Sequence, residues 1–149
     1  MAKQTFQGRP VVPGAIQGEA TVSKQPLNPT ASYVDNIWGG NTEAAPCTDA
    51  DNKDLYQKDL AGVILCTPQT IGSSMGGGCL MAVAGLGVAP KAMLFSRHID
   101  SVSASGIVMA NVWQEKPIVT IDLLGDQFLE AVKTGDPISV KSDGTVEIG

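Results

Sequence analysis

The strongest constraint on the fold is an alternation of short apolar segments with helix-like segments between residues 60 and 122. A continuous apolar run of strand length predicts a strand buried on both faces, which is typical of a parallel sheet covered by helices. We predict strands over residues 60–66, 92–96 and 117–122, separated by helices over residues 74–86 and 100–113. This order favours crossover helices on a parallel sheet and therefore an α/β fold.

The two ends of the chain have the character of antiparallel β-structure. Residues 11–23 alternate in polarity on either side of Pro13-Gly14, which predicts a hairpin. Near the C-terminus, a short helix over residues 126–133 precedes two strands, 138–140 and 145–148, joined by an Asp-Gly turn. β-rich ends on a helix-covered sheet predict a three-layer β/β/α arrangement. Since 149 residues do not suffice for two full domains, we expect residues 1–149 to form one.

A polar segment over residues 28–58 lacks regular periodicity. A stretch of about thirty irregular residues in a small domain is typical of a functional loop or of a segment ordered by a partner. Trp38 within it is expected to pack against a partner or against the domain's own core. Trp113, at the end of a predicted helix, is expected in the core.

Charge and cysteine content limit the classes of function. A net charge of −5 disfavours a nucleic-acid surface, because phosphates require clustered lysines and arginines. No apolar run approaches the roughly 20 residues that span a bilayer, and the start does not resemble a signal peptide, so we expect a cytoplasmic protein. The three cysteines lack close spacing, and Cys66 and Cys79 stand in apolar runs, which predicts core thiols and no metal site within this chain.

The most informative segment runs Gly72-Ser73-Ser74-Met75-Gly76-Gly77-Gly78, at the junction of a buried strand and a helix. Ligands of α/β sheets bind at the carboxyl ends of strands, and helix N–H groups favour an anion there. A serine acts as a base only where its alkoxide is stabilised. Either serine is also a good helix cap, which is the simpler interpretation. A Walker-type phosphate loop is excluded, because no lysine follows the glycines.

A second junction of this kind carries Arg97-His98-Ile99-Asp100. Since it also follows a predicted strand, it can line the same cleft as Ser73. The favoured interpretation is a solvated turn in which Asp100 caps the following helix.

Short motifs spread along nearly the whole chain resemble the small subunit of aconitase X in order and spacing. They are Gly8-Arg9-Pro10-Val11-Val12-Pro13-Gly14, Gly18-Glu19-Ala20, Trp38-Gly39-Gly40, Leu60-Ala61-Gly62, Gly72-Ser73-Ser74 and Lys116-Pro117-Ile118-Val119. The resemblance implies a swivel domain similar to those of aconitase and isopropylmalate isomerase, and a hydro-lyase activity. Members of the family dehydrate cis-3-hydroxy-L-proline or mevalonate 5-phosphate.

The same resemblance implies roles for individual residues. Ser73 corresponds to the aconitase-type serine base, with Ser74 as a second hydrogen-bonding group and Gly72 allowing substrate to approach. Arg9, in the Gly-Arg-Pro element, would reach substrate or the partner subunit, although an ordinary surface salt bridge explains it equally well. The iron–sulfur cluster of the family is held by a large subunit, so we expect an obligatory large-subunit partner.

Three departures from the family pattern bear on the substrate. Met75 stands where aconitase-type domains have an arginine, Thr70-Ile71 where archaeal members have another, and Gly39-Gly40-Asn41 departs from Gly-Gly-Val-Asp-Pro. Without a fixed cation beside Ser73, a phosphorylated substrate is disfavoured and a small, hydroxyproline-like acid is favoured. The alternative function is a non-catalytic swivel-fold module that binds a small anion or a protein partner, and Met75 is its best support.

Overall fold

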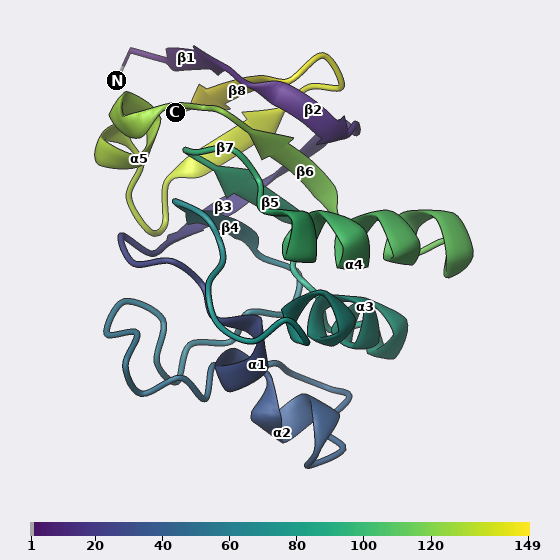
Figure 1. Ribbon diagram of the computed structural model, residues 1–149. Coiled ribbons are helices and arrows are strands. Elements are labelled where there is room, and N and C mark those ends of the chain that lie inside the picture. Colours follow the sequence, from purple (N-terminus) through teal and green to yellow (C-terminus); the bar gives the residue numbers. More distant parts are fainter. Residues whose placement is uncertain (1) are drawn as a thin grey trace.

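A computed structural model describes residues 2–149 (Figure 1), in which eight strands form one hydrogen-bonded ladder in the order β1-β8-β7-β3-β4-β5-β6-β2. The strands are β1 (Gln4–Gln7), β2 (Arg9–Val12), β3 (Ile16–Val22), β4 (Ile64–Thr67), β5 (Ala92–Phe95), β6 (Val119–Asp122), β7 (Pro137–Val140) and β8 (Thr145–Ile148). The helices are α1 (Pro29–Ser32), α2 (Val34–Ile37), α3 (Gly76–Leu86), α4 (Ser101–Trp113) and α5 (Asp126–Ala131).

The ladder consists of two sheets that share β3. Strands β3, β4, β5 and β6 are parallel, and β2 pairs antiparallel with β6 at one edge. On the other side of β3, strands β7, β8 and β1 are antiparallel. Only Gly8 separates β1 from β2, although they lie at opposite ends of the ladder, so the ladder must curl back on itself. A Cβ at Gly8 would lie 2.5 Å from Ile121 Cγ2, which explains the glycine at this bend.

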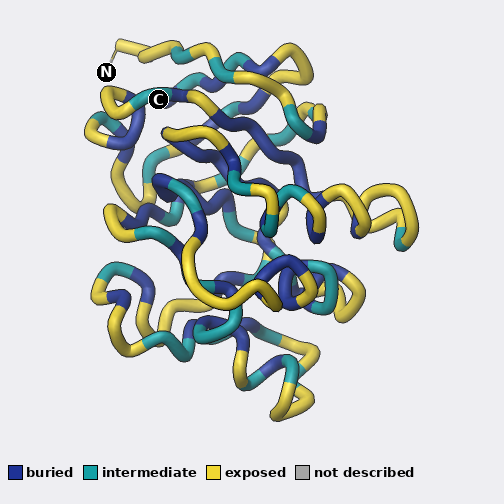
Figure 2. The backbone as a smooth tube through the Cα atoms, in the orientation of Figure 1, coloured by how far each residue is buried: buried dark blue, intermediate teal, exposed yellow. Residues whose placement is uncertain are grey.

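Successive residues of the parallel strands point into two different cores. Ile64 and Cys66 of β4 pack in the core between the two sheets, whereas Leu65 packs in the core beneath the helices. Strand β5 follows the same rule, with Leu94 on the sheet side and Phe95 on the helix side. The buried strands accordingly run through the middle of the molecule (Figure 2). The predicted three-layer β/β/α architecture is therefore confirmed.

The hairpin predicted over residues 11–23 is wrong. Strand β2 pairs with β6, with Val12 opposite Thr120, and β3 pairs with β4 and β7, with Ala20 opposite Ile64. Val12 belongs to the core under the helices, whereas Ala20 and Val22 belong to the core between the sheets. The Pro-Gly signal marks a chain reversal, but the burial of these side chains in different cores sends the two strands to different neighbours.

Residues 28–58 are not a structureless loop, because they include α1 and α2 and contribute buried side chains. Tyr33, Cys47 and Leu55 lie in the core under α3 and α4, and Cys47 N donates to Lys58 O at 2.8 Å. Trp38 is 59% exposed, so the expectation that it packs in the domain's own core is wrong. Whether the segment contacts a partner stays a prediction.

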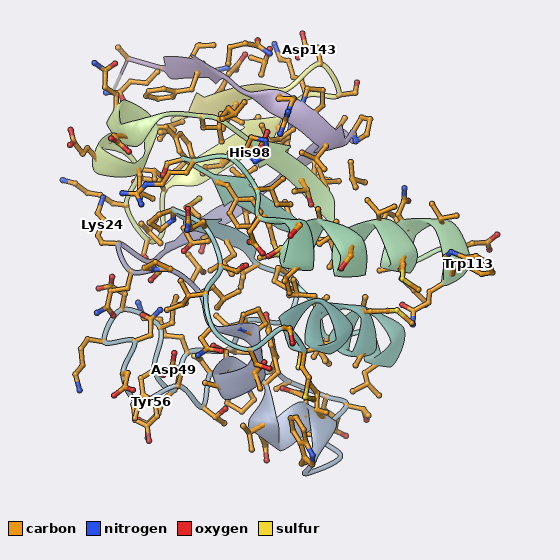
Figure 3. All side chains as sticks on the ribbon, in the orientation of Figure 1. Lys24, Asp49, Tyr56, His98, Trp113 and Asp143 are labelled. Carbon is orange, nitrogen blue, oxygen red and sulfur yellow. The ribbon has the colours of Figure 1, made fainter. Side chains whose placement is uncertain are left out.

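Trp113 is 77% exposed, so its predicted place in the core is also wrong. The last turn of α4 extends past the edge of the sheet (Figure 1), and Trp113 lies at its far end (Figure 3). The expected core positions of Cys66 and Cys79 are confirmed, since both thiols are buried. Among the helices of residues 2–149, none has both the length and the apolar character that a membrane span requires.

Candidate functional site

The carboxyl ends of the parallel strands meet at one edge of the sheet, and polar residues follow several of them. Ser73 lies in the segment that follows β4, His98 and Asp100 follow β5, and Asp122 ends β6. Arg9 begins β2, which runs antiparallel to β6 and places Arg9 directly opposite Asp122. The fold thus brings residues from four distant parts of the chain to the edge at which α/β folds bind ligands.

Ser73 lies on an exposed turn that leads into α3. Its Oγ accepts a hydrogen bond from Met75 N at 3.1 Å, and its carbonyl accepts one from Gly76 N at 2.9 Å. The hydroxyl contact belongs to the turn and is not a helix cap, because the N-cap of α3 is Met75, which has no side-chain capping hydrogen bond. The expected capping of α3 by one of the serines is therefore wrong. Because the contact uses only a lone pair, and the Ser73 proton has no acceptor within the described part of the chain, it is compatible with a role in proton transfer.

Gly72 gives the turn its shape. Its φ of +101° lies in the region that favours glycine, and a Cβ there would lie 2.6 Å from Asn28 Oδ1. Asn28 cannot easily move away, because its Oδ1 accepts the capping hydrogen bond of α1 from Ala31 N. Ser74 is exposed, with no side-chain hydrogen bond to residues 2–149. The predicted functions of Gly72, Ser73 and Ser74 stay predictions.

Asp100 caps α4, as predicted, since its Oδ2 accepts from Ser103 N at 3.0 Å. Its Oδ1 accepts from Ser103 Oγ at 2.7 Å and from the hydroxyl of Thr70, which also contacts Ser103 Oγ. Partial burial acts to raise the pKa of Asp100, but the hydrogen bonds from Thr70 and Ser103 outweigh it and hold that pKa below its usual value. The carboxylate thus joins the segment after β4 to the start of α4.

Arg9 forms the ion pair that was one of its two expected roles. Its Nε lies 2.9 Å from Asp122 Oδ1 and its NH2 lies 2.6 Å from Asp122 Oδ2. The Asp122 side chain is fully buried, whereas that of Arg9 is 49% exposed. The hydrogen bond and charge of Asp122 raise the pKa of Arg9. Asp122 Oδ2 also accepts from Ile99 N at 2.8 Å, so the carboxylate fixes both the arginine and the segment after β5.

His98 completes this group (Figure 3). Its Nδ1 lies 2.6 Å from the carbonyl oxygen of Ile99, so Nδ1 carries a proton and donates it. Its Nε2 lies 3.3 Å from Arg9 NH2, which is itself only a donor, so Nε2 accepts. His98 therefore contacts Arg9 and the Ile99 carbonyl together and helps Asp122 to orient Arg9. For the turn that carries His98, the sequence favoured a solvated turn and offered a place beside Ser73 as the alternative. Asp122 was missed, and its signal was an acidic residue at the end of an apolar strand.

The cysteines of this chain do not fit an iron–sulfur cluster. Cys47, Cys66 and Cys79 are free and buried, and burial raises the pKa of the Cys66 thiol, which opposes the thiolate that a cluster requires. Within residues 2–149, no three His, Cys, Asp or Glu side chains are grouped so that they can hold a metal ion.

We predict that Asp122→Asn destabilises the chain by about 1–3 kcal/mol. An amide has no charge to pair with Arg9, and its NH₂ group would face an N–H donor where one carboxylate oxygen now accepts. Urea unfolding followed by circular dichroism measures this change. Glu43→Gln, on an exposed side chain, is the control and should shift the free energy of unfolding by less than about 0.5 kcal/mol. Equal small shifts for both variants would contradict the ascribed role of Asp122.

Comparisons with known proteins agree with this architecture. The chain matches the family described as Aconitase X swivel domain over residues 5–148. It is 32% identical over 145 residues to the phosphomevalonate dehydratase small subunit of Thermococcus gammatolerans, covering 96% of each chain. The protein of the same name from Archaeoglobus fulgidus is 31% identical over 144 residues, covering 96% of this chain and 97% of its own length.

Two solved structures are similar over nearly the whole chain. The holo-form of Thermococcus kodakaraensis aconitase X has a TM-score of 0.81 and 28% identity, covering 98% of each chain. A solution structure of a UPF0107 protein has a TM-score of 0.76 and 29% identity, covering 98% of this chain and 99% of its own. The expected family is thereby confirmed. The two curated relatives are named as small subunits of a dehydratase. This chain belongs to the aconitase X swivel-domain family.

Proposed function

We propose that this chain is the small subunit of a hydro-lyase that dehydrates a hydroxy acid together with a large subunit. The observation that carries this proposal is the family match over residues 5–148, which includes the exposed Ser73 turn. The relatives named as small subunits of a dehydratase support the heteromeric assembly. A cytoplasmic location stays a prediction.

In this proposal Ser73 is the base. Dehydration removes a proton from the carbon beside the substrate carboxylate while a hydroxide leaves the neighbouring carbon. The proton passes to Ser73 Oγ, and the electron pair of the broken C–H bond forms the double bond as the C–O bond breaks. The hydroxyl proton of Ser73 must first pass to water or to a base of the large subunit. The N–H of Met75, whose nitrogen lies 3.1 Å from Oγ, stabilises the alkoxide that this transfer leaves.

We also propose that an iron–sulfur cluster belongs to the large subunit. Such a cluster supplies Lewis-acid chemistry toward a hydroxyl or carboxylate group. The three buried thiols of this chain are unsuited to holding it, so the contribution of this subunit is confined to proton transfer and substrate binding. Arg9 is the proposed cationic contact for the substrate's carboxylate or for the large subunit, since half of its side chain is exposed beyond Asp122.

The substrate class that we propose is a small, unphosphorylated hydroxy acid, with cis-3-hydroxy-L-proline as its example. No lysine or arginine occurs over residues 68–78, and the side chains that flank the serines, Ile71 and Met75, are apolar and about half exposed. A phosphate group would therefore find no cation from this turn, whereas a pyrrolidine ring would find apolar contacts. Mevalonate 5-phosphate is the second candidate, supported by the names of the curated relatives.

We predict that the complex with its large subunit turns over cis-3-hydroxy-L-proline with a kcat/KM at least about 10-fold above that for mevalonate 5-phosphate, a difference that one missing ion pair accounts for. Met75→Arg should narrow this ratio, because it adds a cation beside Ser73. Met109→Arg, at a comparably exposed methionine on α4, is the matched control and should leave the ratio unchanged.

Three outcomes of this assay have distinct meanings. A preference for mevalonate 5-phosphate by the unaltered complex would overturn the proposed substrate class but not the hydro-lyase. A stable complex that turns over neither acid would favour the non-catalytic binding module. Failure to form any complex would contradict the heteromeric assembly.

A further inference from the structure

The segment between β4 and α3 must hold Ser73 in place without regular secondary structure of its own. A misplacement of about 1 Å at a reacting group can cost about 100-fold in rate, so such a segment requires fixed anchors. One anchor is a short backbone pairing with the segment after β3. Leu27 N donates to Gln69 O at 3.1 Å, and Ile71 N donates to Leu27 O at 2.8 Å.

The second anchor is the contact of Thr70 with Asp100 and Ser103. Thr70 is 6% exposed and Ser103 is fully buried, so their hydroxyls cannot turn to water. Three contacts link the group: each of the two hydroxyls contacts Asp100 Oδ1, and the two hydroxyls contact one another. Only two hydroxyl protons are available for these three contacts. In every arrangement that keeps both protons within the group, at least one hydroxyl donates to Asp100 Oδ1, and these hydrogen bonds favour the ionised carboxylate.

A helix cap alone does not require this group. The capping hydrogen bond is the one from Ser103 N to Asp100 Oδ2, at 3.0 Å. Asp100 Oδ1 faces a residue that is thirty positions away in the sequence and belongs to the segment carrying Ser73. Thr70 precedes Ser73 by three residues, a span of at most about 11 Å of chain. Gly72 lies between them and is packed against Asn28, so the short connection is constrained on both sides.

We propose that Thr70 and Asp100 are positioning residues for Ser73: their hydrogen bond, completed by Ser103, locks the turn after β4 onto the start of α4. This inference rests on the proposed function of Ser73 as a base. Neither residue touches the reacting atoms. Their effect is transmitted through Ile71 and Gly72 to the orientation of the Ser73 hydroxyl.

Thr70→Val tests the proposal, because valine keeps the shape of threonine and removes the hydroxyl. We expect kcat of the complex with its large subunit to fall by about 10- to 100-fold with KM changed by less than about 3-fold. Thr70→Ser should restore most of the rate, since it returns the hydroxyl. The control is Thr120→Val, which removes an equally buried hydroxyl that donates to Ile118 O at 2.8 Å.

Amide hydrogen exchange of the chain gives a readout that does not depend on activity. In Thr70→Val, the amides of Ile71 and Met75 should exchange at least about 10-fold faster, and in Thr120→Val they should be unchanged. Equal kcat and equal exchange in the two valine variants would overturn the positioning role. An active Ser73→Ala complex would instead overturn the proposed base, so the two failures can be told apart.

Discussion

Ser73→Ala is expected to lower kcat of the assembled enzyme by about 10²- to 10⁴-fold, the range associated with loss of a general base. The hydroxyl is exposed and accepts only the hydrogen bond from Met75 N in the described structure, so the fold should be unaffected. KM should change little, because the lost group acts on the proton in the transition state. Steady-state dehydration by the complex with its large subunit measures the effect.

Ser105→Ala is the matched control for this variant. Ser105 is also exposed, and its hydroxyl makes one local contact, with Val102 O at 2.7 Å. Its removal should leave kcat within about 2-fold and the free energy of unfolding within about 0.5 kcal/mol. A Ser73→Ala enzyme as active as Ser105→Ala would eliminate Ser73 as the base.

Gly106→Ala is expected to have the largest effect on stability, a loss of at least about 2–3 kcal/mol. Helices α3 and α4 touch backbone to backbone at this point. A Cβ on Gly106 would lie 1.9 Å from Gly77 O, and a Cβ on Gly77 would lie 2.3 Å from Val102 O. Since the obstructing atoms belong to the main chain, the two helices would have to separate, which would also disturb the turn before α3.

The partner helix α3 provides the control for Gly106→Ala. A Cβ at Gly78 of α3 would meet no atom of the described residues within 4 Å. Because alanine is the better helix former, Gly78→Ala should leave stability unchanged or raise it by up to about 1 kcal/mol. Urea unfolding measures both variants. Equal midpoints for the two would contradict the close crossing of α3 and α4.

The middle of the chain was predictable because its signals are local. The helices α3 and α4 and the strand β5 begin and end within two residues of their predicted bounds. The buried strand β4 was also predicted, but it begins at Ile64, four residues after the predicted start at residue 60. Strand β1 was missed, since Gln4-Thr5-Phe6-Gln7 has no apolar alternation. Phe6 is the residue of β1 that packs against the core between the sheets, and it is partly buried. The centroid of its ring lies 5.4 Å from that of Phe128. Only the tertiary structure gives this segment a partner.

Two features of the site were predictable, because each depends on residues within a single turn of the chain. The glycines and serines around Ser73 form a recognisable strand-to-helix junction, and Asp100 stands where a capping residue is expected. The contacts of Thr70 and Asp122 were not predictable in this way. Each depends on which strands lie side by side, and the register that sets Arg9 opposite Asp122 joins residues 113 positions apart.

In the proposed mechanism Ser73 removes a carbon-bound proton of the substrate. The most direct measurement is the initial rate of deuterium transfer between D₂O and the combined pool of substrate and product, followed by NMR in the complex with its large subunit. We predict that Ser73→Ala lowers this rate by at least about 100-fold, in parallel with kcat, whereas Ser105→Ala leaves it unchanged. Deuterium transfer that continues at the unaltered rate in Ser73→Ala would show that another group takes the proton and would contradict the account.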